Sequence, residues 1–318
     1  MTRNIPALAY FAYNRKSTVA QTLPNILKYK FNHIYIFADG AKNIEDQIKV
    51  TEVRKIILKL TKNKDVTLIF YKKNKGLRKV IFESLDFVFK KESMAIIMED
   101  DTLADQIFFN FCKKLLNFHK NDKNIWCIGG SNFLKKKYLK NNVYFYTKYF
   151  HCWGWATWKD RWKKIDRNVV FWPEWKNSKN FSKIFKSIEE KNYWKHIFES
   201  VYKNELVTWD YQVFLNLLYK QYLTIIPPQN LVQNIGFGLE STSTNFSNID
   251  LCKPINSISI NKIKKNEKIE LSEDIDRRIF DIVWEGARMK CKNSISLLLY
   301  FLTNYKKYYY KLLYKIKH

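Results

Sequence analysis

Short apolar runs alternate with longer amphipathic stretches over residues 1–130. The runs are rich in Ile, Val, Phe and Tyr, as buried strands are, and the stretches between them repeat apolar residues at helical spacing. The pattern predicts strands at residues 7–13, 33–37, 65–71, 94–98 and 125–128, and helices at about 17–29, 45–60, 79–89 and 104–119. Strands and helices that alternate at such short intervals indicate an α/β fold with a mostly parallel, twisted sheet flanked by helices.

The periodicity loosens after residue 130 but still predicts further elements. We expect helices within residues 181–202, a helix opening at 206–212 with Thr208 as its cap, and a strand at 222–226. The predicted organisation is an α/β domain at residues 1–248 (halves 1–130 and 131–248), a linker or arm at 249–270, and a helical tail at 271–318.

The composition fits a folded chain in a reducing compartment. The 318 residues are 46% hydrophobic with only 8 Gly and 6 Pro, which excludes fibrous and disordered classes. The 5 cysteines form no C-x-x-C pair, so neither a zinc site nor a disulfide framework is expected. The sequence shows neither a signal peptide at its start nor an apolar run of the ~18–20 residues that a membrane span needs. We therefore expect a cytoplasmic protein.

The net charge of +26 is extreme and points to an anionic partner. Nucleic acid, a lipid surface and a phosphate-bearing substrate all meet that description. The positive charge can also result from a general bias in amino-acid composition, because Lys, Asn, Ile, Phe and Tyr are enriched together. Drift in composition explains part of the total charge, but it does not explain why basic residues cluster.

Three consecutive carboxylates, Glu99, Asp100 and Asp101, follow the apolar run at residues 94–98. Strand alternation predicts that Glu99 and Asp101 face one way and Asp100 the other. Like charges this close repel unless a cation compensates them, and oxygen ligands suit Mn²⁺ or Mg²⁺. The alternative interpretation is a solvated loop after a core strand.

Polar clusters also follow the other strands. They are Asn14-Arg15, Asp39 and Asn74-Lys75-Gly76-Leu77-Arg78. Ligands of open α/β sheets bind outside the carboxyl ends of the strands, so these clusters are expected to converge on one nucleotide-binding edge. Neither G-x-G-x-x-G nor a P-loop motif occurs in the sequence, which argues against a dinucleotide enzyme or a P-loop ATPase.

Two later stretches carry candidate chemistry. Residues 149–158 are strongly aromatic, and Trp153, Gly154 and Trp155 can form the floor of a sugar-binding cleft or a plug in the core. His151 within this stretch is more typical of a hydrogen-bonded core histidine than of a catalyst. Asp210 lies in the first turn of a predicted helix, which suits either a general base or ordinary helix-start chemistry.

The end of the chain is basic and aromatic. No acidic residue follows Glu285, residues 294–302 are apolar, and residues 305–317 interleave Tyr with Lys. The pattern favours a helix that lies in an anionic membrane interface. Nucleic-acid binding uses the same residue types, and a helix packed on the domain is compatible with the membrane interpretation.

Taken together, six motifs resemble those of GT-A nucleotide-sugar glycosyltransferases, in particular bacterial relatives of N-acetylglucosaminyltransferase I. In chain order they are Ala12-Tyr13-Asn14-Arg15, Phe37-Ala38-Asp39-Gly40, Asn74-Lys75-Gly76-Leu77-Arg78, Glu99-Asp100-Asp101, the block from Trp153 to Trp158, and Trp209-Asp210-Tyr211-Gln212. Each motif is weak alone, and the resemblance rests on their order over residues 6–244.

The resemblance implies a role for each matching position. The nucleoside would contact Tyr13, Asn14, Arg15 and Asp39. The donor sugar and diphosphate would contact Asn74, Gly76 and Arg78. Asp101 would bind the metal, Glu99 and Asp100 would contact the ribose or metal-bound water, and Asp210 would be the catalytic base. The implied reaction is an inverting transfer from a nucleotide-diphosphate sugar, with UDP favoured, to a hydroxyl of a bacterial surface glycan or lipid-linked acceptor at the inner face of the plasma membrane.

One position departs from the family pattern. Relatives often carry a histidine in the Thr-rich tract after the Gly-x-Gly loop, whereas this chain has Ser243. A hydroxyl is a weaker metal ligand than imidazole, so the departure implies weaker metal binding, or a replacement such as His151. Two competing functions are a sugar nucleotidyltransferase, which would need a glycine-rich loop at residues 14–18, and a non-catalytic nucleic-acid-binding protein, which leaves the strand-end clusters unexplained.

Overall fold

The computed structural model describes residues 5–134, 144–236, 251, 253–266, 268–291 and 294–303. Ser243, which stands where relatives often carry a histidine, lies outside this described part of the chain. The Tyr- and Lys-rich residues 305–317 lie outside it too. Within it, eight strands form one sheet in the order β3-β2-β1-β4-β8-β6-β9-β7, and β10 and β5 form a separate pair.

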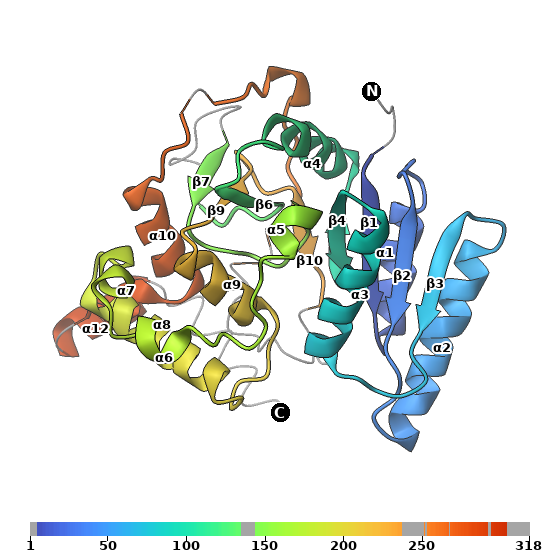
Figure 1. The fold of residues 1–318 in the computed structure, drawn as a ribbon, viewed down its shortest axis with the longest axis horizontal. Helices are drawn as coiled ribbons and strands as arrows, with labels where there is room; N and C mark the ends of the chain where they lie inside the picture. The colour runs from blue at the N-terminus through green and yellow to red at the C-terminus, as the bar shows by residue number, and fades with distance from the viewer. Residues whose placement is uncertain are drawn as a thin grey trace.

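The strands are β1 (Ala7–Ala12), β2 (Ile34–Ala38), β3 (Val66–Phe70), β4 (Met94–Glu99), β5 (Thr102–Ala104), β6 (Ile125–Gly129), β7 (Phe145–Thr147), β8 (Trp155–Trp158), β9 (Leu223–Ile226) and β10 (Val232–Asn234). β3, β2, β1 and β4 are parallel neighbours, as are β6 and β9. β8 lies antiparallel between β4 and β6, and β7 lies antiparallel to β9. The predicted α/β fold with a mostly parallel sheet is confirmed (Figure 1).

Helices cover both faces of the sheet. They are α1 (Lys16–Ile26), α2 (Ile44–Thr61), α3 (Leu77–Lys91), α4 (Gln106–Phe118), α5 (Lys159–Trp162), α6 (Trp172–Trp175), α7 (Lys179–Ile184), α8 (Ile188–Tyr202), α9 (Asp210–Tyr219), α10 (Glu273–Val283), α11 (Gly286–Met289) and α12 (Ser294–Thr303). One core lies under α1, α2 and α4, and the other lies under α3, α8, α9 and α10. Alternation along β1 sorts its residues between the two: Leu8 and Tyr10 join the first core, and Ala7, Ala9 and Phe11 join the second.

The four short strands β5, β7, β8 and β10 were not predicted. Three or four residues carry too little periodicity to be distinguished from loops. β8 has the sequence Trp-Ala-Thr-Trp, and all four of its residues are buried between β4 and β6. The aromatic block therefore contributes a central strand of the sheet.

Trp155 of β8 is fully buried in the second core. Its ring stacks on Trp126 at a centroid distance of 5.3 Å and on Trp209 at 5.8 Å. The cleft-floor interpretation is wrong for Trp155, whose side chain has no surface left for a sugar. Trp153 is half-buried, with its ring edge-on to Phe133, and Gly154 adopts a left-handed φ of 60°. His151 is a core residue, as expected, because its ring is buried and stacks on Trp284, but its Nε2 has no hydrogen-bond partner among the described residues.

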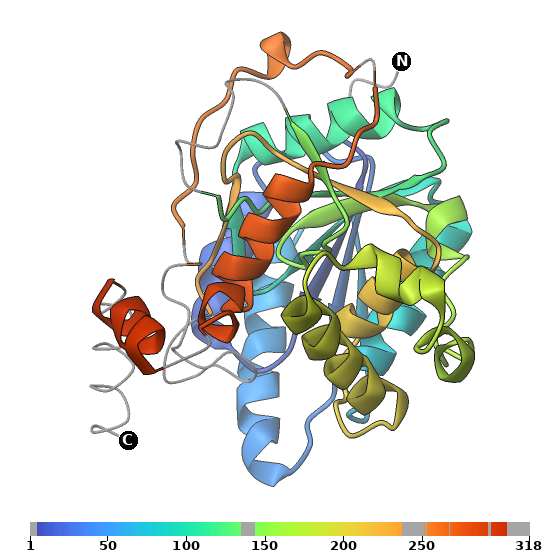
Figure 2. The ribbon, with the colours of Figure 1, turned by 90° about the vertical axis from the view of Figure 1, so that its left-hand side faces the viewer.

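The first part of the predicted tail is packed into the molecule. Ser272 caps α10, whose Ile275, Ile279 and Phe280 are buried in the second core. α12 lies at the periphery (red in Figure 2) and exposes Leu298, Leu299 and Leu302 by 56–59%. Among the described helices, none is long and apolar enough to cross a membrane.

Candidate active site

The three carboxylates lie at the carboxyl edge of the parallel strands. Glu99 is the last residue of β4 and is paired in register with Phe11 of β1. Asp100 and Asp101 form the turn that leads into β5. Arg15, directly before α1, donates to both of them, with Nη1 3.0 Å from Oδ2 of Asp101 and Nη2 bonded to Oδ1 of Asp100. The predicted opposite orientation of Asp100 and Asp101 is wrong, because strand alternation stops at Glu99.

Negative charge is in excess at this edge. Asp100 is only 2% exposed, and burial, reinforced by Asp101, raises its pKa to about 7 against the opposing effect of Arg15. Glu99 is half-buried. Its pKa is raised well above the usual value by desolvation and by the charges of Asp101, Asp100 and Asp210. Among the described residues, Arg15 forms ion pairs with Asp100 and Asp101 but not with Glu99, so the centre favours a further cation or bound protons.

Asp210 reaches this centre from the far half of the chain. It begins α9, and its charge acts on Glu99 and on the thiol of the half-buried Cys152. Burial raises the pKa of Asp210, while a hydrogen bond from Thr208 opposes the rise. Thr208 was expected to cap α9, but Trp209 holds the cap position and the Thr208 hydroxyl donates to the Asp210 carboxylate instead. A carboxylate with a raised pKa, positioned by a neighbouring hydroxyl, is suited to accept a proton.

A glycine backbone closes over the Arg15–Asp101 ion pair. The Ile235 amide donates to the backbone oxygen of Asp101 at 2.8 Å, just after β10 pairs with β5. A Cβ on Gly236 would lie 2.5 Å from Oδ2 of Asp101 and 2.7 Å from Nη1 of Arg15. A larger residue at this position would therefore push the Asp101 and Arg15 side chains out of their present positions. The sequence showed a loop here but gave no sign that it would contact Asp101, because the contact depends on the β5–β10 pairing.

Asp39 anchors the loop between β3 and α3. Its carboxylate accepts from the amides of Lys75 and Gly76, each at 3.0 Å, and from Nδ2 of Asn74 at 3.1 Å. Gly76 adopts a left-handed φ of 78°, which glycine allows at no steric cost. The structure thus brings three predicted nucleotide-binding positions, Asp39, Asn74 and Gly76, into one hydrogen-bonded unit.

Tyr13 and Asn14 join this unit through Asp46, which the sequence analysis missed. Nδ2 of Asn14 donates to Asp46 at 2.6 Å, the Tyr13 hydroxyl donates to the other oxygen, and Nδ2 of Asn74 lies 3.3 Å from the same hydroxyl. Burial raises the pKa of Asp46, but these hydrogen bonds outweigh burial and the net pKa is lowered. In the sequence Asp46 is an ordinary first-turn acid of α2, so no local signal distinguishes it.

Arg78 is the predicted site residue that lies apart. Its Nη1 donates to Oδ1 of Asn204 at 2.9 Å, on the side of α3 that faces the end of α8. Among the described residues, Arg78 forms no hydrogen bond or ion pair with Asp39, Asn74 or the three carboxylates, so its assignment to the donor diphosphate stays a prediction.

The residues present suit a divalent metal that is only partly coordinated by protein. Among the described residues, no group of three or more His, Cys, Asp or Glu side chains forms a complete metal-binding cluster. Arg15 occupies Oδ2 of Asp101, and the Thr102 hydroxyl lies 3.5 Å from Oδ1. Mg²⁺ and ions like it are commonly held by one or two carboxylates together with water and substrate phosphates. The excess negative charge around Glu99 and Asp101 fits such an ion.

The sequence matches no protein-family model and no curated protein. Among solved structures, the chain is similar to the mannosyltransferase PcManGT from Pyrobaculum calidifontis, in complex with GDP-Man and Mn²⁺, with 16% identity, a TM-score of 0.34, and coverage of 50% of this chain and 46% of the other. It is also similar to GalNAc-T7 with UDP, GalNAc and Mn²⁺, with 9% identity and a TM-score of 0.44. That match covers 76% of this chain and 45% of the other. The chain spans less than half the length of either protein. At this degree of similarity neither structure assigns a function to the chain.

The Arg15–Asp100 ion pair makes a pH-dependent prediction for stability. In Arg15→Gln, Asp100 keeps its burial but loses its countercharge, so we expect a loss of roughly 3–5 kcal/mol in the free energy of unfolding at pH 8. The folded-state pKa of Asp100 is raised, so the penalty is fully present above that pKa and shrinks as the pH falls toward the unfolded value near ~3.9. Urea denaturation at pH 8 and pH 5 should therefore show the larger loss at pH 8.

Two variants control this measurement. Arg277→Gln removes an equal charge from an exposed pair on α10 and should change stability little. Arg15→Gln combined with Asp100→Asn should recover part of the loss at pH 8. An equal loss at both pH values would mean that the charge of Asp100 is not what Arg15 stabilises.

Proposed function

We propose that the protein is a metal-dependent glycosyltransferase of the GT-A type that transfers a sugar from a nucleotide-diphosphate sugar, with UDP favoured, to an acceptor hydroxyl. The observation that supports the proposal is the charge interaction of Asp210, at the start of α9, with Glu99, which in turn interacts with Asp100 and Asp101. A candidate base from one half of the chain would then act near a candidate metal site from the other half, at the carboxyl edge of a parallel sheet, where such folds bind ligands.

The donor would lie along this edge. Tyr13 and Asn14, held by Asp46, together with the loop that Asp39 anchors, would receive the nucleoside. Arg15 and Asp101 lie at the next strand end, where the diphosphate would follow. Asp101 would hold Mn²⁺ or Mg²⁺ with Glu99 and Asp100 nearby, and the bound ion would neutralise charge on the leaving nucleotide.

Asp210 would take the proton of the attacking acceptor hydroxyl. Thr208 fixes the orientation of its carboxylate, and the partly buried position raises its basicity. A single carboxylate base without an enzyme nucleophile implies one displacement, and therefore inversion at the anomeric carbon. The acceptor would be a bacterial surface glycan or a lipid-linked saccharide.

The same proposal places the protein at the inner face of the plasma membrane. Three leucines of α12 are more than half exposed at the molecular periphery, and the sequence that follows is rich in Lys and Tyr. A surface on which exposed apolar side chains lie beside basic ones binds to anionic membrane interfaces. A lipid-linked acceptor would be met there.

Two competing functions make different predictions. A sugar nucleotidyltransferase would be expected to carry a glycine-rich loop after the first strand, and residues 14–18 contain no Gly. A non-catalytic nucleic-acid-binding protein would account for the charge, but it has no use for carboxylates collected around Glu99.

The first prediction of the proposal concerns metal and nucleotide. We expect calorimetric titration to show binding of one nucleoside diphosphate among UDP, GDP and CDP in Mn²⁺, and its loss in EDTA. Asp101→Ala should abolish this metal-dependent binding and donor turnover while leaving the fold intact. Asp105→Asn is a matched control, because Asp105 caps α4 and asparagine caps equally well. Absence of nucleotide binding, with tight salt-sensitive binding to DNA or RNA, would contradict the proposal.

The second prediction concerns the base. We expect Asp210→Asn to keep nucleotide affinity but to lower the transfer rate by on the order of 10²–10⁴-fold, the usual contribution of a general base. Glu205→Gln, an exposed substitution just before α9, should leave the rate unchanged. Full activity of Asp210→Asn would contradict the role of Asp210 as the general base and leave it a structural role at the start of α9.

The third prediction concerns the membrane. Deletion of the chain after Asn293 should release the protein from anionic vesicles in a sedimentation assay. Substitution of Leu298, Leu299 and Leu302 by Ser should release it in part, because apolar contact and basic charge each contribute. Leu58→Ser, at an exposed leucine of α2, is the matched control. Unchanged vesicle binding after the deletion would place the contact elsewhere.

A further inference from the structure

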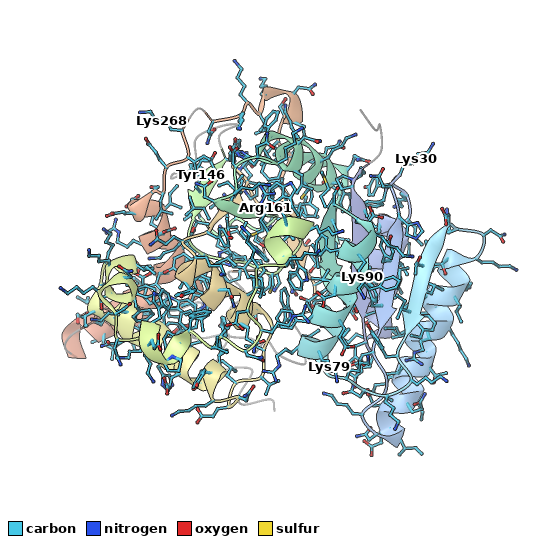
Figure 3. The ribbon with its side chains drawn as sticks, in the orientation of Figure 1. Lys30, Lys79, Lys90, Tyr146, Arg161 and Lys268 are labelled. Carbon is cyan, nitrogen blue, oxygen red and sulfur yellow. The ribbon has the colours of Figure 1, made fainter. Side chains whose placement is uncertain are left out.

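A cavity of about 460 Å³ is lined by residues of α3, α8 and α9. Its walls come from the first turns of α3, the turn at residues 167–169, the end of α8, and α9. α3 follows the loop anchored by Asp39, and α9 begins with Asp210. Figure 3 labels Lys79, one of the lining residues, at the lower end of α3. The cavity is therefore lined by the helix that follows the proposed donor loop and by the helix that begins with the proposed base.

Three cations line this cavity, and one of them lacks a countercharge. Lys79 lies 3.8 Å from Glu83, and Arg167 pairs with Asp86 at 2.5 Å. Arg78 has no carboxylate partner among the described residues, and its Nη1 donates a hydrogen bond to the neutral amide of Asn204. An unpaired guanidinium in a concave site is a suitable partner for a carboxylate or a phosphate.

Gln212 adds a second, independent observation. The residue is only 4% exposed, lines the cavity, and donates from Nε2 to the backbone oxygen of Arg167 at 3.1 Å. A backbone carbonyl can only accept, so this bond fixes which way the amide points. The other atom, Oε1, is buried without a hydrogen-bond partner. A buried carbonyl oxygen in this state is costly, and a ligand with a hydroxyl group can supply the donor it lacks, which an ionised carboxylate cannot.

The remaining wall is mixed: Glu83, Asn168, Tyr202 and Asn204 contribute polar groups, and part of it is apolar. Phe82, Val169 and Val201 line the apolar part. Val169 adopts a φ of 45°, a conformation that β-branched residues rarely take. The turn around it is fixed by Asp166, whose carboxylate accepts from the amides of Asn168 at 2.9 Å and of Val170 at 2.8 Å. A strained turn that its surroundings hold in place is typical of ligand sites.

We propose that this cavity binds an acidic sugar of the acceptor, with Arg78 pairing to its carboxylate or phosphate and Oε1 of Gln212 accepting from one of its hydroxyls. The apolar part of the wall would receive the less polar face of the ring. The proposal rests on the proposed glycosyltransferase function, since it names the class of acceptor that would be presented to Asp210.

The test is titration of the full chain with acidic and neutral sugars. The probes are the 6-phosphates and the uronates of glucose, galactose and mannose, the three parent hexoses, and inorganic phosphate. We expect at least one acidic sugar to bind at least 10-fold more tightly than its parent hexose and at least 10-fold more tightly than inorganic phosphate. Whichever of the 6-phosphate and the uronate of that hexose binds more tightly then identifies the anion that the cavity prefers. Equal binding of acidic and neutral sugars, or no binding by any probe, would overturn the proposal.

Two substitutions separate the parts of the site. Arg78→Gln should weaken the acidic sugar roughly 10-fold without changing the parent hexose, as expected for loss of one charge-assisted contact. Gln212→Met should weaken every sugar that binds but not inorganic phosphate. Arg277→Gln controls for the lowered net charge, and thermal unfolding of each variant checks the fold.

The nucleotide titration distinguishes the two proposals. If Arg78→Gln weakens UDP binding in Mn²⁺ and leaves the acidic sugar unchanged, Arg78 contacts the donor and the acceptor site is overturned. If acidic sugars bind as expected and no nucleotide binds, the cavity stands as an acidic-sugar site and the transferase proposal fails.

Discussion

The charge pairs of Arg15 with Asp100 and Asp101 hold the candidate active site together. They join the start of α1 to the turn after β4, so two neighbouring parallel strands share one polar edge. Asp100 is buried, and a buried carboxylate without its countercharge is strongly destabilising. The rest of the site depends on this contact, because Gly236 packs directly on Arg15 and Asp101.

A second acid stabilises the neighbouring loop in another way. The Asp39 carboxylate accepts hydrogen bonds from the Asn74 side chain and from the backbone amides of Lys75 and Gly76. These bonds fix residues 74–76 ahead of α3. This loop sets where α3 begins, and the start of α3 carries Arg78 into the cavity beside α9. The donor edge and the proposed acceptor cavity are thus connected through one short segment whose shape depends on Asp39.

The aromatic residues explain how Asp210 comes to meet Glu99. Trp155 of β8 stacks on Trp209, and β8 pairs with β4, the strand that ends at Glu99. Trp209 immediately precedes Asp210, so ring packing in the core fixes the start of α9 relative to the end of β4. Trp155, which the sequence suggested for the floor of a sugar-binding cleft, instead packs in the core against the residue that precedes Asp210.

Sequence alone determined the alternating strands and helices of residues 1–130, because their apolar periodicities are long enough to be unambiguous. It also determined that polar clusters end the strands, including Glu99, Asp100 and Asp101. Only the tertiary structure decided which groups meet. Asp46 and Gly236 gained their contacts through packing and short-strand pairing, and Arg78 was directed toward Asn204 by the helix that carries it. Local patterns report the burial of single elements, whereas distances between residues far apart in the chain are set by the packed core, which no local pattern encodes.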